Sequence, residues 1–171
     1  MLLDRPTIVH AFGRLDAQLA ARGVRAELFL VGGAVMCVVH QARPSTKDVD
    51  GWFTEPQVVR AAARVVAGEL GLPEDWLNDA AKGFVPPNAG YERWQALPNL
   101  TISHVDTETL LAMKCAASRT DADAEDIRTL AGLLGLSSSA KILDIVTRYF
   151  PEERLPVRAR LLLEEMFDDG A

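Results

Sequence analysis

A short apolar run that ends in two glycines and leads directly into a second apolar run constrains the fold of this chain most. Residues 27–31 have the length of a strand, Gly32 and Gly33 follow, and residues 34–41 predict a helix. The N–H groups of a helix's first turn attract anions, and glycine lets a phosphate approach the backbone. The pair is therefore either a phosphate-holding turn or only a tight connection. The third glycine of a dinucleotide fingerprint and the Gly-Lys-Ser/Thr end of a Walker loop are both missing.

A second strand, predicted over residues 48–53, carries two aspartates. Residues at i and i+2 of a strand point to the same side, so Asp48 and Asp50 should project together, about 7 Å apart. Val49 and Phe53 fall on the opposite side, which marks that side as buried. Carboxylates this close repel each other unless a cation lies between them, and Mg²⁺ prefers carboxylate oxygens, phosphates and water. Asp48 and Asp50 are therefore metal-binding candidates, with an exposed face bearing two solvated acids as the alternative.

The rest of the pattern predicts an α/β (α+β) fold with an all-α end. We expect helices over residues 6–22 and 57–70, a third strand over 100–105, and an irregular connection over 73–98, which contains four prolines and two tryptophans. Four more helices are predicted: 107–118, 123–134, 138–149 and 152–167. The expectation is a small mixed sheet flanked by helices in residues 1–106 and a helical part in 107–171, either one folding unit or two tightly packed ones.

Composition indicates a soluble cytoplasmic protein. Hydrophobic residues make up 49 % and charged residues 25 % of the chain, which suits a globular domain. No apolar run approaches the roughly 18 residues of a membrane span, and the first residues lack the order of a secretory signal. Cys37 and Cys115 lie in apolar runs far apart, so we expect two buried thiols in a reducing compartment.

The net charge of −6 argues against extended, nonspecific binding to nucleic acid, which depends on neutralising phosphates. An acidic protein that handles a polyphosphate must recruit metal ions or concentrate its few cations locally. Such a local groove could be lined by Arg43, Lys47, Lys82 and Arg93.

A further group of polar residues lies in the helical part. Lys114 is the one cation inside an apolar helical stretch, so it either snorkels to solvent or reaches a polar cavity. Asp123 and Asp126 open the next predicted helix, where acids also suit the free N–H groups and the helix dipole.

The glycine turn and the segment that carries the two aspartates together resemble the signature of a known family. Val31-Gly32-Gly33, then Thr46-Lys47-Asp48-Val49-Asp50 with fifteen residues from Gly33 to Asp48, resembles the signature of the DNA polymerase β-like nucleotidyltransferase superfamily. More narrowly, the chain is similar to the AbiEii and MenT group of bacterial toxin nucleotidyltransferases and related minimal domains. The resemblance implies that the glycines, with Lys47 nearby, bind a nucleotide triphosphate. It also implies that the aspartates are catalytic and bind Mg²⁺ while a hydroxyl attacks the α-phosphate.

The toxin group also shows a Leu-x-x-Lys-x-x-Ala-x-x-Arg helix followed by an Asp-x-x-Asp turn. Leu111, Lys114 and Ala117 match this pattern, and Arg119, Asp123 and Asp126 follow in slightly shifted form. The resemblance implies that Lys114 is catalytic and contacts nucleotide phosphate, that Arg119 and Asp123 bind nucleotide, and that Asp126 or Asp123 completes the polar site.

A third carboxylate, which many superfamily members carry on a later strand, has no counterpart in the strand predicted over 100–105. That strand offers only His104, which is more often structural than functional. The third acid therefore comes from Asp126 or Asp79, or two carboxylates suffice, or catalysis has been lost.

The resemblance implies a Mg²⁺-dependent enzyme that moves a nucleotide from an NTP to an acceptor. That acceptor is expected to be RNA, such as a tRNA 3′ end, and the enzyme to be the toxin of a toxin–antitoxin pair with a cognate antitoxin protein. Transfer to a small molecule or a protein is the alternative within the same fold. A catalytically silent domain that binds a nucleotide or a partner is a second alternative, and a structural helical protein with coincidental acids is a third.

Overall fold

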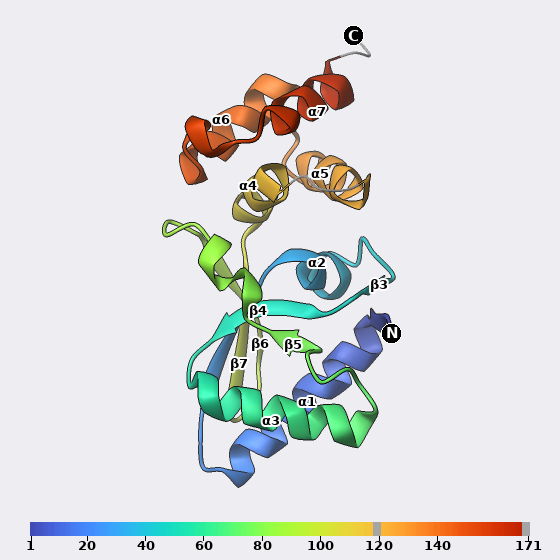
Figure 1. Cartoon of the computed structure of the whole chain (residues 1–171), viewed down its shortest axis with the longest axis vertical. Coiled ribbons are helices and arrows are strands. Elements are labelled where there is room, and N and C mark those ends of the chain that lie inside the picture. The colour runs from blue at the N-terminus through green and yellow to red at the C-terminus, as the bar shows by residue number, and fades with distance from the viewer. Residues whose placement is uncertain (118–120, 169–171) are drawn as a thin grey trace. The chain divides into compact units, whose positions relative to one another are not determined.

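The computed structural model describes residues 1–117 and 121–168, which fall into two units (Figure 1). The sheet unit consists of Met1–Gly83 and Tyr91–Val105, and the helical unit consists of Phe84–Gly90 and Asp106–Ala171. The mixed α/β class expected from the sequence is confirmed, since strands and helices alternate in the first unit and helices fill the second.

The sheet unit is built on five strands in the order β5-β4-β2-β7-β6. Their bounds are Leu77–Asn78 for β5, Val49–Phe53 for β4, Ala26–Leu30 for β2, Leu100–Val105 for β7 and Tyr91–Ala96 for β6. β2 pairs antiparallel with β4 and parallel with β7, β4 pairs parallel with β5, and β6 pairs antiparallel with β7. Two short strands, β1 (Leu3–Asp4) and β3 (Ser45–Thr46), form a separate antiparallel pair.

One face of this sheet is covered by α1 (Arg5–Ala21) and α3 (Pro56–Leu70), which also pack on each other (Figure 1). α1 begins where the Asp4 carboxylate accepts the N–H of Thr7 at 2.9 Å, which satisfies one of the unpaired donors of the first turn. The core between helices and sheet is fully buried and includes Phe12, Leu15, Leu28, Val66, Trp76 and Ile102. Within it, the indole N–H of Trp76 donates to the carbonyl of Ala63 at 2.9 Å.

The irregular connection predicted over residues 73–98 is wrong, because the structure places β5 and β6 there, with the 3₁₀ turn η2 (Ala80–Phe84) between them. β5 has only two residues, too few for an alternation pattern to show. In β6 the alternation is broken by a register shift between Arg93 and Gln95.

The helix predicted over 34–41 is α2 (Gly32–Ala34) followed by the π-helical turn η1 (Val35–Val39). The helix predicted over 152–167 is divided into η3 (Glu152–Arg154) and α7 (Val157–Phe167), because Pro156 cannot supply a helical N–H.

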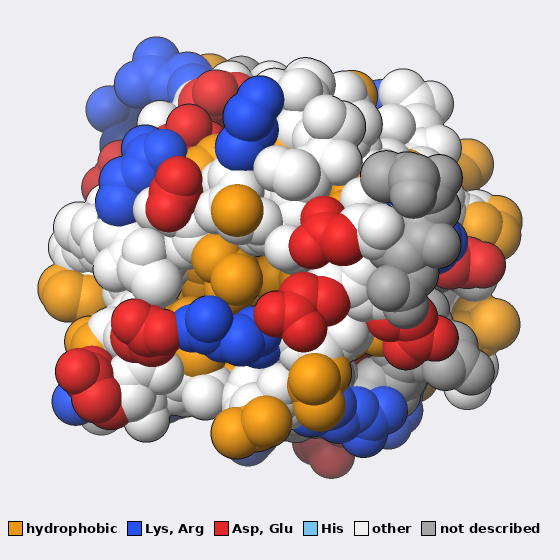
Figure 2. Space-filling model, turned by 90° about the horizontal axis from the view of Figure 1, so that it is seen from above, with side chains coloured by type: hydrophobic (Ala, Val, Ile, Leu, Met, Phe, Trp, Pro, Cys, Tyr) orange, Lys and Arg blue, Asp and Glu red, His pale blue; other side chains and the backbone are white. Residues whose placement is uncertain are grey.

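The helical unit contains α4 (Thr107–Ala117), α5 (Asp121–Leu133), α6 (Ser139–Tyr149) and α7. The carboxylate of Asp168, just after α7, accepts the backbone N–H of Ser139 at 3.1 Å and also its hydroxyl, which fastens the end of α7 to the start of α6. Apolar side chains are not confined to the interior, since Val157 and Leu161 are exposed four residues apart on α7. One face of the molecule carries hydrophobic side chains among acidic and basic ones (Figure 2).

The two cysteines are buried, as expected. Burial raises the pKa of the Cys115 thiol to about 12, so this thiol is neutral near pH 7. Within the described ranges, none of the helices has the length and apolar character that crossing a membrane requires.

Because β2 and β4 lie in tight contact, we expect any side chain at position 51 to destabilise the protein. A Cβ there would lie 2.7 Å from the carbonyl oxygen of Phe29 on the neighbouring strand, so Gly51→Ala must push the strands apart. We expect the free energy of unfolding, measured by urea titration, to fall by about 1–3 kcal/mol. Gly68→Ala is the control, because its Cβ would meet open space on α3, and it should stabilise the protein by up to about 1 kcal/mol. Equal effects of the two variants would contradict this packing.

Candidate functional site

The glycine turn and Asp50 lie against each other at the end of β2. The backbone N–H of Val31 donates to the carbonyl of Asp50 at 2.9 Å, which brings the turn alongside β4. Gly32 has a φ of 63°, a left-handed conformation that disfavours other residues. A Cβ at Gly32 would lie only 3.6 Å from Oδ2 of Asp50. The carboxylate and the start of the helical segment 32–39 therefore border the same space.

A second chain segment lies over the next residue of this turn. A Cβ on Gly33 would stand 2.8 Å from Oγ1 of Thr46 and 3.6 Å from Nη1 of Arg43. The Thr46 hydroxyl in turn donates to the carbonyl of Asp48 at 3.1 Å. The loop that leads into β4 thus brings a guanidinium and a hydroxyl to the first helical turn.

Asp48 and Asp50 have the strand register that the sequence predicts. Val49, Gly51 and Phe53 are buried, whereas Asp50 and Trp52 are partly exposed. Asp48 precedes β4 by one residue and is partly exposed as well. The two carboxylates therefore belong to the side of β4 that does not face the core.

Asn78 is a site residue that the sequence prediction missed. β5 pairs with β4 in a register that places Asn78 opposite Asp50, and its Nδ2 donates to Oδ2 of Asp48 at 3.3 Å. Its Oδ1 accepts the N–H of Ala80 at 3.1 Å, which fixes which end of the amide faces the carboxylate. The only signal for it in the sequence is its position next to Asp79, which is a candidate because of its charge.

Asp79, the candidate for a third acid in the sheet unit, and His104, which is not an acid, both have other partners. Asp79 forms an ion pair with Arg60 at 2.5 Å. His104 is buried, and its Nδ1 lies 2.7 Å from the carbonyl oxygen of Val105, which is a structural role. Across residues 1–117 and 121–168 no group of three or more His, Cys, Asp or Glu side chains is placed to hold a metal ion. In the sheet unit, the two aspartates are accompanied by an amide.

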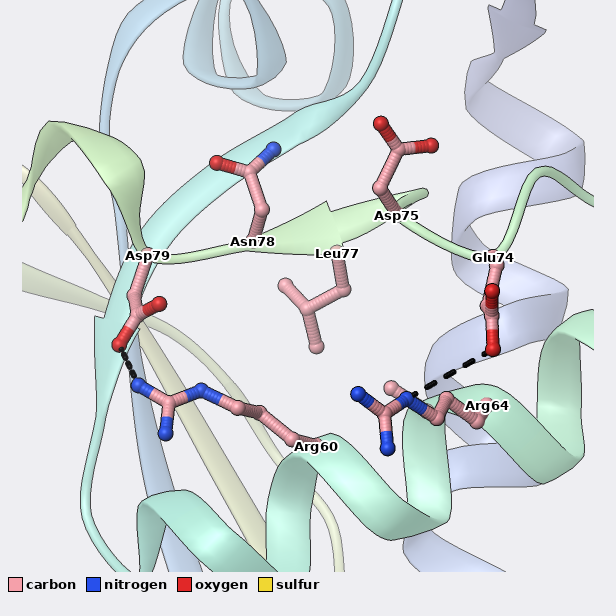
Figure 3. A pocket seen from close by; sticks show the side chains of 8 residues that line it. Arg60, Arg64, Glu74, Asp75, Leu77, Asn78 and Asp79 are labelled. Carbon is pink, nitrogen blue, oxygen red and sulfur yellow. Dashed lines mark hydrogen bonds and ion pairs between the residues drawn. The ribbon is translucent and has the colours of Figure 1, made fainter.

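A pocket lies on the other side of β5, against α3 (Figure 3). Leu77 points into it, whereas Asn78 points to the opposite side, and Arg64 at its rim pairs with Glu74 at 3.7 Å. With a volume of about 230 Å³ it is smaller than the roughly 300 Å³ at which ligand pockets begin. Because its arginines are neutralised by neighbouring acids, we do not place a triphosphate there.

In the helical unit, Lys114 is buried with two carboxylates. Its Nζ lies 3.0 Å from Oδ1 of Asp123 and 2.8 Å from Oδ2 of Asp126. Lys114 is 9 % exposed and Asp126 is 2 % exposed, so the lysine does not snorkel. Asp123 and Asp126 are three residues apart on α5 and thus share one side of that helix.

The predicted residues therefore form two groups. Gly32, Gly33, Asp48 and Asp50 come together in the sheet unit, and Lys114, Asp123 and Asp126 come together in the helical unit. Lys47 is exposed next to Asp48 in the chain, and Arg119 lies outside the described residues. That the two groups serve one reaction stays a prediction from the resemblance.

No family model, no curated protein and no solved structure matches this chain.

The buried triad predicts a large effect of removing its cation. Lys114→Met removes the ammonium group that lies beside two carboxylates, one of them fully buried, and should lower the free energy of unfolding by about 3–5 kcal/mol. Adding Asp123→Asn and Asp126→Asn to this variant should restore most of the loss, because the two carboxylates that the ammonium group neutralised are then removed as well. Lys141→Met, at an exposed lysine on α6, is the control and should stay within about 0.5 kcal/mol of the unmodified protein. A cost below about 1 kcal/mol for Lys114→Met in urea titrations would contradict the triad.

Proposed function

We propose that this chain is a Mg²⁺-dependent nucleotidyltransferase that moves a nucleotide from an NTP to an RNA acceptor such as a tRNA 3′ end. The observation that carries the proposal is the position of Asp50 against the Gly32 turn, with Asp48 on the same side of β4. Backbone N–H groups of a helical start attract phosphate, and carboxylates attract a divalent cation. A triphosphate that carries a metal ion needs both kinds of group side by side.

The donor set fits Mg²⁺. Asp48 and Asp50 offer hard oxygen ligands, and substrate phosphates and water would supply the rest, which is the usual arrangement for this ion. When bound, Mg²⁺ would neutralise charge on the triphosphate and on the departing pyrophosphate. Asn78 would hold Asp48 in position through its amide N–H, since its oxygen is committed to Ala80.

Positive charge at the phosphate end would come from Arg43, whose guanidinium borders Gly33. An arginine fork suits phosphate oxygens because two N–H groups can bind in parallel. By resemblance, Lys114 also contacts phosphate in the proposed enzyme, and Lys47, Arg119 and Asp123 assist nucleotide binding. A phosphate at Lys114 would then compete with the carboxylates that hold it.

The toxin role and a cognate antitoxin rest on the resemblance alone. They predict that expression of the unmodified chain arrests growth, that Asp48→Asn abolishes the arrest, and that a small neighbouring gene encodes a protein that relieves it. A catalytically silent nucleotide-binding domain is the second candidate, and the observation that favours it is an amide, Asn78, next to the aspartates where a third acid would complete the set.

Transfer of label from each α-³²P NTP to bulk tRNA in the presence of Mg²⁺ tests the proposal. Asp48→Asn or Asp50→Asn should reduce transfer by about a hundredfold or more, because several kcal/mol of charge stabilisation depend on the metal ligands. Glu55→Gln is the matched control, since this exposed carboxylate follows β4 at its other end and should leave transfer unchanged. If no NTP labels RNA while calorimetry still shows Mg²⁺-dependent NTP binding, the chain is the silent binding domain.

Asn78 provides a finer test of the site. Asn78→Ala removes the hydrogen bond that orients Asp48 and should lower transfer or Mn²⁺ affinity by about 10–100-fold without unfolding the protein. Asn78→Asp places a third acid at this position and should tighten Mn²⁺ binding, measured by the loss of the free-ion electron paramagnetic resonance signal. Unchanged Mn²⁺ affinity in both variants would show that Asn78 does not contribute to the metal site.

A further inference from the structure

A row of paired residues crosses the sheet on the side that carries Asp50. Trp52 of β4 is opposite Phe29 of β2, Phe29 is opposite Ser103 of β7, and Ser103 is opposite Arg93 of β6. Directly paired residues lie on the same face of a sheet, so these four side chains form one transverse line. Strands far apart in the sequence thus bring two aromatic rings, a hydroxyl and a guanidinium into one row.

This row is not part of the core. The alternate residues Leu28, Ile102 and Phe53 are buried on the face that α1 and α3 cover. Phe29, Trp52 and Ser103, in contrast, are partly exposed, and Arg93 is exposed. Asp50 lies two residues before Trp52 on the same side of β4, about 7 Å along the strand.

The aromatic rings are held in a fixed arrangement. Phe29 and Trp52 are stacked, with centroids 3.9 Å apart and planes inclined by 11°. Tyr91 stands edge-on to both, and its hydroxyl accepts the indole N–H of Trp52 at 3.0 Å. The polar atom of Trp52 is therefore satisfied within the cluster, and the two stacked rings are pre-organised.

The charged side chains on this face lie at different ends of the row. Arg93 lies at one end of the row, and Asp50 lies beside its other end. Glu27, exposed two residues before Phe29, is on the same face, and β2 runs antiparallel to β4, so Glu27 lies on the side of the aromatic pair away from Asp50. A phosphate is thus attracted at Arg93 and repelled by the carboxylates of Glu27 and, unless a metal ion is bound there, of Asp50, so Arg93 is the place on this face that suits a phosphate.

We propose that this face binds single-stranded RNA, with a base stacked on the Phe29–Trp52 pair and a phosphate at Arg93. Aromatic side chains beside a cation are the usual means of holding single strands, because every base offers a π-face. The inference rests on the proposed function for the role of Asp50, toward which the strand's reacting end would be directed. The RNA acceptor of the proposed reaction would lie on this surface.

Binding of a fluorescein-labelled oligoadenylate of about twelve nucleotides, followed by anisotropy without NTP or Mg²⁺, tests the inference. We expect Trp52→Leu to weaken binding about tenfold or more, and Arg93→Gln to weaken it less while reducing the slope of log affinity against log salt by about one. Trp94→Leu is the matched control, because Trp94 of β6 packs edge-on to Phe12 of α1 at 6.2 Å, on the covered face, and should leave binding unchanged. Circular dichroism melting of each variant verifies that it is folded.

The outcomes separate this inference from the proposed function. Loss of binding in folded Trp52→Leu, with binding retained in Asp50→Asn, supports the inference even if no label is ever transferred. Transfer to RNA that Trp52→Leu does not alter, with unchanged oligoadenylate binding, overturns the inference and leaves the proposed function standing. If the folded, unmodified protein does not bind the oligonucleotide, the inference is wrong.

Discussion

The pairing of β2 with β4 is the constraint on which the sheet unit depends. One hydrogen bond, from the Val31 N–H to the Asp50 carbonyl, continues the ladder to the point where β2 turns at Gly32. In this register Gly51 faces the core and Asp50 does not. A shift by one residue would turn the carboxylate into the core and the small Gly51 outward, at a large cost for the buried charge. The same ladder that builds the sheet therefore sets the distance between glycine turn and carboxylate.

In the helical unit, the ion pairs of Lys114 with Asp123 and Asp126 have the role that the β2–β4 pairing has in the sheet unit. Lys114 lies among apolar residues of α4, and its ammonium group tolerates this place because two acids of α5 are within hydrogen-bonding distance. Such a group stabilises a fold little compared with apolar residues of equal volume, but it strongly disfavours any packing that separates the partners. It thus specifies how α4 and α5 face each other.

The sequence predicted what local patterns encode. The glycine turn, the side of β4 that carries Asp50, and the helices of both parts follow from spacing within single segments. Asn78 and the aromatic row could not be predicted in this way. Asn78 matters because a two-residue strand pairs with β4 across nearly thirty residues of chain. Phe29 and Arg93 belong to one row only because β2 and β6 each pair with β7 in a particular register. Neither register leaves a pattern in the segment itself, whereas Asp123 and Asp126 stand out in the sequence because both lie at the start of one predicted helix.

An amide beside two aspartates has a physical consequence for the proposed site. A third carboxylate would add repulsion between like charges, whereas the Asn78 N–H donates a hydrogen bond to the Asp48 carboxylate and adds no charge. Less negative charge also means weaker attraction for a metal ion alone, so in the proposed reaction the triphosphate must supply much of the binding. The metal ion and the nucleotide are therefore expected to bind together rather than one after the other. This suits a protein with a net charge of −6, whose acidic surface would otherwise repel the nucleotide.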